Sequence, residues 1–136
     1  MIITKHDLGD KIEWRNKEGL LHRLDGPAIE WPNGVKEWYC NGVRHRLDGP
    51  ALWLSNDSWQ WWQDGKAHRV DGPAFRSSDN KYQWWFKGVC YYGYCGYYDC
   101  FAWEGRWFYS LESWFKVIPD ELKINYLFYG VVFPGD

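Results

Sequence analysis

The string His22-Arg23-Leu24-Asp25-Gly26-Pro27-Ala28 decides the fold, because it returns twice at a fixed interval. It recurs unchanged at residues 45–51, and again at residues 68–74 with valine in place of leucine. Both steps are 23 residues long. Self-similarity at a fixed period of about 20–50 residues is typical of repeat proteins. We therefore predict tandem repeats over residues 22–44, 45–67 and 68–90, called repeats 1, 2 and 3 below.

The second half of each repeat reads as a β-hairpin. Trp38, Trp61 and Trp84 each stand four residues before a glycine. The Asn41-Gly42 pair in repeat 1 is typical of a two-residue hairpin turn, because both residue types tolerate a positive φ. We expect strands at Ala28–Trp31 and Val35–Cys40 in this repeat, and the equivalent pairs in the others. An incomplete unit precedes repeat 1, so the hairpin repeats span residues 10–90.

The fold class predicted from this pattern is mainly β. We expect a single-layer antiparallel meander of tandem β-hairpin repeats, with about eight strands over residues 10–109 and a short α-helical C-terminal cap. The 136 residues suit one domain. Within it, residues 91–109 form a degenerate repeat and residues 110–136 form the helical cap. Atypical end units are needed to close the open edge of a repeat array.

One or two short helices are predicted in the cap, within residues 110–129. Ser110 is placed to cap a helix from Leu111 to about Val117. Pro119-Asp120-Glu121 is typical of a second helix start, with acids near the positive end of the helix dipole. The residues expected on the inner face of the second helix, before a stop at Gly130, are Leu122, Tyr126 and Leu127, widened by Ile124 and Phe128.

The repeat resembles a known family. A 23-residue hairpin unit with a ring, then Asn-Gly or Asp-Gly, then histidine resembles the MORN repeat. Its His-Arg-x-Asp-Gly-Pro-Ala form is similar to repeat proteins encoded by large bacteriophages and giant DNA viruses. The resemblance covers roughly residues 10–90. It implies a single-layer, twisted meander of hairpins, and it implies no particular activity.

Charge and composition narrow the classes of partner. The net charge is −2, so the chain lacks the basic bias typical of nucleic-acid binders, and we expect no nucleic-acid partner. No apolar run approaches the roughly 18 residues that a membrane span needs, and residues 1–6 do not resemble a signal peptide. We expect no membrane partner and a cytoplasmic location, in the host cell if the protein is viral.

Residues that could carry chemistry are read as structural. The recurring His and Asp residues give three similar environments, whereas an enzyme needs one preorganised site. We expect Asp25, Asp48 and Asp71 to sit at turns and to accept local backbone hydrogen bonds. The spacing of Cys90, Cys95 and Cys100 favours free thiols, with zinc or a disulfide as alternatives. We expect no cofactor, no metal site and no catalytic residue.

The aromatic residues are the informative feature, since the chain holds 12 Trp, 10 Tyr and 7 Phe. Trp38, Trp61 and Trp84 should form one row, and Tyr39, Trp62 and Trp85 a row on the opposite face, because neighbouring strand residues alternate. Trp31, Trp53 and Trp59 each occur in one repeat only. The set predicted to form one partner-binding patch is Trp31, Trp53, Trp59 and Trp62.

Three functions are consistent with the sequence. The first is a non-catalytic binding protein, of viral type, that docks a host protein on an aromatic sheet face and inhibits or modulates it, in host takeover or anti-defence. The second is a small-ligand or nucleotide sponge, with rings stacking a base and Arg23, Arg46 or Arg69 holding phosphate. The third and weakest is a hydrolase using a His/Asp pair. Open sheet edges also allow a homo-oligomer.

Overall fold

The computed structural model describes residues 2–94 and 99–127. It confirms a mainly β fold built as an open antiparallel meander, with two short helices at the C-terminal end. The chain divides into two compact units, Met1–Lys66 and Ala67–Asp136, here called the N-terminal unit and the C-terminal unit. Each is described by itself.

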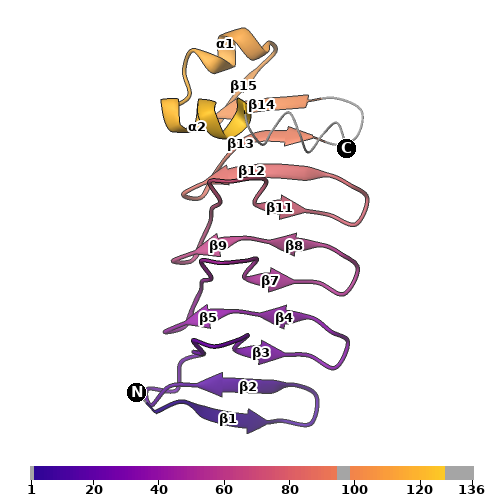
Figure 1. The fold of residues 1–136 in the computed structure, drawn as a ribbon, viewed down its shortest axis with the longest axis vertical. Coiled ribbons are helices and arrows are strands. Elements are labelled where there is room, and N and C mark those ends of the chain that lie inside the picture. Colours follow the sequence, from indigo (N-terminus) through magenta and orange to yellow (C-terminus); the bar gives the residue numbers. More distant parts are fainter. Residues whose placement is uncertain (1, 95–98, 128–136) are drawn as a thin grey trace. The chain divides into compact units, whose positions relative to one another are not determined.

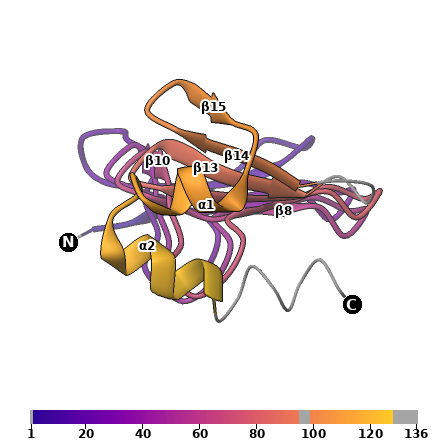
Figure 2. The same ribbon diagram turned by 90° about the horizontal axis from the view of Figure 1, so that it is seen from above.

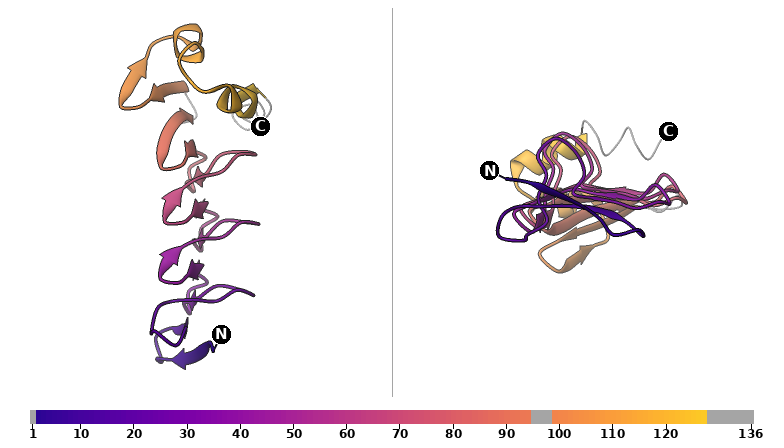
Figure 3. Two further views of the ribbon diagram at one scale, coloured as in Figure 1. Left: turned by 90° about the vertical axis from the view of Figure 1, so that its left-hand side faces the viewer. Right: turned by 90° about the horizontal axis from the view of Figure 1, so that it is seen from below.

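The N-terminal unit is a meander whose strands follow one another as β1-β2-β3-β4-β7-β8 (Figure 1). A small hairpin, β5 with β6, branches from it. Its strands are β1 (Thr4–Asp7), β2 (Ile12–Arg15), β3 (Ile29–Glu30), β4 (Lys36–Glu37), β5 (Tyr39–Cys40), β6 (Val43–Arg44), β7 (Leu52–Trp53), β8 (Trp59–Gln60) and β9 (Trp62–Gln63), followed by β10 (Lys66–Ala67) at the boundary with the next unit. The segments leading into β3 and β7 project from the same side of this sheet (Figure 3).

The predicted number of strands was too small. Described residues between 10 and 109 contain fourteen strand segments, β2 to β15, instead of about eight. The expected strand Val35–Cys40 is divided at Trp38 because the chain changes partner there. Lys36 and Glu37 pair with β7, whereas Tyr39 and Cys40 pair with β6. The branch places a second hairpin turn at Asn41-Gly42, where both residues have positive φ as predicted (48° and 84°).

The C-terminal unit holds a sheet of order β11-β12-β13-β14-β15 with both helices. Its strands are β11 (Phe75–Arg76), β12 (Tyr82–Phe86), β13 (Val89–Tyr94), β14 (Asp99–Trp103) and β15 (Arg106–Phe108). The helices α1 (Leu111–Phe115) and α2 (Asp120–Asn125) lie against one face of this sheet (Figure 2). The core between them is aromatic, and its buried members are Trp84, Tyr91, Tyr92, Trp114, Ile118, Leu122 and Tyr126.

The cap helices follow the sequence prediction in part. The Ser110 hydroxyl accepts a hydrogen bond from the Ser113 N–H, which confirms the predicted cap. In α2, Leu122 and Tyr126 face the core as expected, but Ile124 and Leu127 are exposed. A helix this short presents a narrow apolar stripe, because residues three and four apart share a face whereas Ile124 does not. The expected contributions of Phe128 and Gly130 lie outside the described residues.

Candidate binding surface

The arginine of each motif folds back over its own loop. In repeat 1, Arg23 Nε donates to Asp25 Oδ1 (2.9 Å) and Nη1 donates to the Pro27 carbonyl (3.1 Å). Its guanidinium carbon lies 3.8 Å from the centre of the Trp14 ring. In repeat 2, Arg46 makes the same two bonds and stacks on Trp38 at 4.1 Å. Cation–π contact and two charge-assisted hydrogen bonds therefore fix each guanidinium in place.

This fold-back explains the glycine of the motif. A Cβ on Gly26 would lie 2.9 Å from the Arg23 guanidinium carbon, and a Cβ on Gly49 would lie 2.6 Å from that of Arg46. The glycine thus leaves room for the folded-back arginine, because a Cβ there would require the guanidinium to shift. The alanine that ends the motif is fully buried in all three repeats.

The histidine of each motif holds the hairpin turn that comes 19 residues later. Nδ1 of His22 accepts the Asn41 N–H (2.9 Å), that of His45 accepts the Asp64 N–H (3.0 Å), and that of His68 accepts the Lys87 N–H (2.9 Å). A ring nitrogen accepts a hydrogen bond only when it carries no proton, so these bonds require the tautomer with the hydrogen on Nε2. The three histidines therefore act as acceptors for backbone groups at left-handed turns.

The expectation that the motif aspartates accept local backbone hydrogen bonds was wrong as to the main partner. Asp25, Asp48 and Asp71 each accept from the Nε of the arginine two residues earlier. The hydrogen bond from Arg23, followed by its charge, lowers the pKa of Asp25 below its ordinary value. The aspartates thus hold arginines, and the motif histidines hold backbone groups, so the two do not form the pairs that a hydrolase would need.

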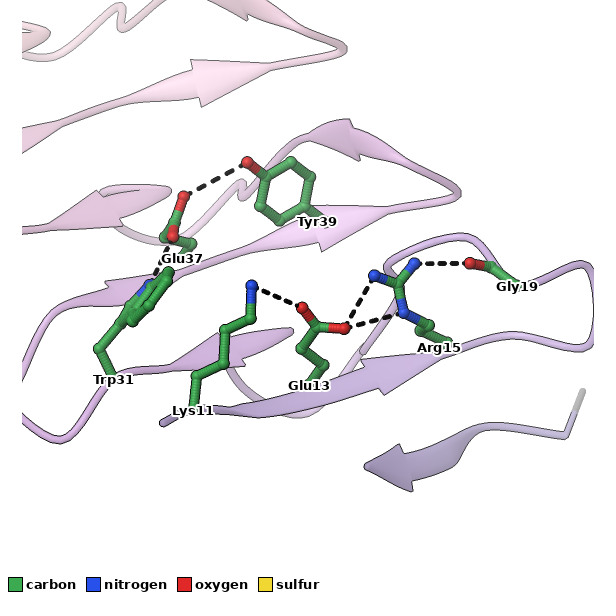
Figure 4. A network of polar contacts seen from close by, with 7 residues as sticks. All are labelled: Lys11, Glu13, Arg15, Gly19, Trp31, Glu37 and Tyr39. Atoms are coloured by element: carbon green, nitrogen blue, oxygen red, sulfur yellow. Dashed lines mark hydrogen bonds and ion pairs between the residues drawn. The ribbon is translucent and has the colours of Figure 1, made fainter. Parts of the chain in front are cut away.

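Buried carboxylates organise the opposite face of the N-terminal unit. Glu13 accepts Arg15 Nε (2.9 Å) and lies 3.0 Å from Lys11 Nζ, while Arg15 Nη1 donates to the Gly19 carbonyl (Figure 4). Burial works to raise the pKa of Glu13, but the hydrogen bonds and charges of Lys11 and Arg15 outweigh it and hold that pKa below its ordinary value. The side chain is thus an ionised anchor.

Glu37 plays the equivalent role in repeat 1. One of its carboxylate oxygens accepts the Trp31 indole N–H (2.7 Å), and the other accepts the Tyr39 hydroxyl (3.3 Å) (Figure 4). The latter oxygen also accepts Arg44 Nη2 (2.7 Å). In repeat 2 a glutamine takes this position, and Gln60 Oε1 accepts the Trp62 indole N–H at 2.9 Å. The polar atoms of Trp31 and Trp62 are therefore satisfied within the unit.

Strand register separates the four predicted tryptophans onto two faces. Trp53 lies directly opposite Trp59 across β7 and β8, and opposite Lys36 across β4 and β7. Trp31 and Trp62 donate to Glu37 and Gln60, and both of these residues pair with Leu52 of β7. Leu52 precedes Trp53 in the strand, so this set lies on the other face. The register therefore places the four tryptophans on two faces of the sheet. Their role in binding stays a prediction.

The Trp53–Trp59 pair is the more open of the two sets. Trp53 is 38% exposed, and Trp59 is half-buried. The positions that match Trp38 and Trp59 in repeat 3 are Trp84 and Tyr82, and there the cap helices cover the face and bury Trp84 completely. Among the described residues of the N-terminal unit, no helix covers the pair. We call Trp53, Trp59 and the adjoining Lys36 the tryptophan face.

The described thiols and potential metal ligands do not meet the requirements of a metal site. Cys40 and Cys90 have free thiols, and burial raises the pKa of the Cys90 thiol to about 11. Cys95 lies outside the described residues. Within residues 2–94 and 99–127, no group of three or more His, Cys, Asp or Glu side chains is arranged to hold a metal ion. None of the described helices has the length and apolar character to cross a membrane.

Comparisons with known proteins identify no relative: no family model, no curated protein and no solved structure matches the chain.

Proposed function

We propose that the chain is a non-catalytic binding protein and that the tryptophan face is where it docks a partner protein. The observation that carries this proposal is Trp53, which pairs with Trp59 across β7 and β8 and is 38% exposed, whereas the helices of the C-terminal unit cover the matching face there. Tryptophan is among the residues that dominate the energetics of protein interfaces. Large side chains kept at the surface thus support docking more than they support folding.

The cap indicates which chemistry suits such a face. In the C-terminal unit, short amphipathic helices supply Trp114, Leu122 and Tyr126 to the rings of the sheet. Trp114 also donates its indole N–H to the Ala102 carbonyl at 2.9 Å. We propose by analogy that the partner presents an amphipathic helix with aromatic and aliphatic residues to Trp53 and Trp59, in the helix-on-apolar-surface manner common in protein recognition.

A viral setting remains part of the proposal. The resemblance of the motif to repeats of large bacteriophages and giant DNA viruses motivates a host protein as the partner, with takeover or anti-defence as the outcome and the host cytoplasm as the place. The nucleotide-sponge alternative receives less support, because Arg23 and Arg46 are already held by a ring, a carboxylate and a carbonyl. These contacts hold each guanidinium against its ring and engage two of its N–H donors, so it would have to turn outward to clamp a phosphate.

The test is a quantitative pull-down with the full chain from lysate of candidate host cells. Wild type, Trp53→Ala and Trp59→Ala are compared, with Trp107→Ala as the control because Trp107 is an exposed tryptophan of the C-terminal unit. We expect one set of proteins to be retained by wild type and the control and lost from both variants, since a true hot-spot tryptophan contributes about 2 kcal/mol or more. Equal capture by all four, with folding verified by circular dichroism, would contradict the proposal.

A further inference from the structure

One position of the repeated motif has no role in holding the fold. Histidine, arginine, aspartate and glycine are accounted for by the contacts above, the proline carbonyl accepts the arginine, and the alanine is buried. The remaining position is Leu24 in repeat 1 and Leu47 in repeat 2, and these side chains are 76% and 67% exposed. Single exposed leucines are ordinary, but here an apolar side chain is held at the tip of each successive loop.

A groove lies between these two loops, entirely within the N-terminal unit. Its volume is about 600 Å³. One wall is formed by Leu24, Asp25 and Gly26, the other by residues 45–48, and Trp38 and Cys40 lie between them. The groove therefore combines two apolar tips with two carboxylates, in a space large enough for a long side chain.

In the groove, the carboxylates lie nearer to solvent than the guanidinium groups. Asp25 and Asp48 are both 87% exposed, whereas Arg23 and Arg46 are only 21% and 26% exposed. Each guanidinium lies inward against a ring, and Arg23 Nη1 also lies 3.7 Å from Glu30 Oε1. A molecule approaching from solvent therefore meets carboxylates first, with the balancing cations behind them. The field at the mouth of the groove favours a cation.

We propose that this groove binds a lysine or arginine side chain of a basic, otherwise apolar segment in a partner protein. The cationic head would lie between Asp25 and Asp48, and its aliphatic stem would lie along Leu24 and Leu47, as long basic side chains do on apolar surfaces. The inference goes beyond the tryptophan face, because it concerns other residues and a partner segment whose positive charge complements Asp25 and Asp48. An anionic ligand would instead meet the outward carboxylates.

The probe is a synthetic peptide, acetyl-Leu-Lys-Leu-Lys-Leu-amide, titrated into the isotope-labelled full chain and followed by amide chemical shifts. We expect saturable shifts at residues 24–26 and 45–48. The main variant is Asp25→Asn combined with Asp48→Asn, because an asparagine oxygen still accepts the arginine Nε–H while the charge is lost. Its binding should be about tenfold weaker, the scale for losing two solvent-exposed ion pairs.

A matched control removes two charges elsewhere. Asp10→Asn with Glu18→Gln changes exposed acids of the same unit that do not line the groove, and this variant should bind the peptide as wild type does. Leu24→Ala with Leu47→Ala should weaken binding through the apolar contact. Any of three results would overturn the proposal: no saturable shift at millimolar peptide, equal binding by the double asparagine variant, or equal binding of the glutamate analogue of the peptide.

Discussion

Replacing the motif histidine by alanine should have very different consequences in repeats 1 and 2, although the bond lost is the same. His22 is 2% exposed and accepts the Asn41 N–H, whereas the side chain of His45 is 23% exposed and accepts the Asp64 N–H. Both donors are left-handed turn residues, with φ of 48° and 50°. The bond lost is therefore the same, and the two sites differ in access to water and in the Asp64 carboxylate, whose Oδ1 lies 3.4 Å from His45 Nδ1.

The expected magnitudes follow from that difference. In His45→Ala, water replaces the lost acceptor, so unfolding should become easier by about 1 kcal/mol. In His22→Ala, the same bond is lost, and a buried ring also leaves a cavity, a change that costs about 2 kcal/mol or more at core positions. We therefore expect a total loss of about 3 kcal/mol for His22→Ala.

Urea unfolding followed by far-ultraviolet circular dichroism, with linear extrapolation, measures both free energies. Amide exchange at Asn41 and Asp64 gives a local readout, since each donor should lose protection in its own variant only. The reasoning is refuted if His45→Ala costs as much as His22→Ala, or if both variants stay within about 0.5 kcal/mol of wild type, the usual range for neutral surface changes.

Three further outcomes are expected. Gly49→Ala should displace Arg46 from its bonds and lower the unfolding free energy by about 1–2 kcal/mol, measured by urea titration; an unchanged midpoint would contradict the space argument. Burial first, and then the Lys87 charge, lower the pKa of His68 in the folded protein, against a smaller opposing effect of Glu121. At His68 the folded state thus binds a proton less readily than the unfolded chain does. The contribution of neutral His68 to the free energy of unfolding is therefore fully present above pH 6.5 and is lost as the pH falls through the folded pKa. Ring titration by proton NMR should show Lys87→Gln raising that pKa, and no rise would refute the assignment. With its pKa raised to about 11, Cys90 should be alkylated by N-ethylmaleimide at pH 8 more slowly than an unperturbed cysteine, as peptide mapping would show; equally fast labelling would refute it.

The sequence by itself determined the repeat and its turns. The 23-residue period, the hairpin at Asn41-Gly42 and the Ser110 cap all depend on local preferences, and local preferences are written in neighbouring residues. The sequence also placed Trp38 and Tyr39 on opposite faces, because alternation along a strand is local.

The tertiary structure decided what each repeated residue does. Asp48 accepts its hydrogen bond from Arg46 because Arg46 folds over Gly49 onto the ring of Trp38. No local pattern in the sequence encodes this contact between side chains. The separation of Trp53 from Trp62 depends on the register of β7 and β8, which pairs Trp53 with Trp59 and Leu52 with Gln60, the residue to which Trp62 donates. Burial depends on packing at a distance: Trp38 and Trp84 occupy the same position of the repeat, yet only Trp84 is fully buried, because the cap helices of its own unit cover it.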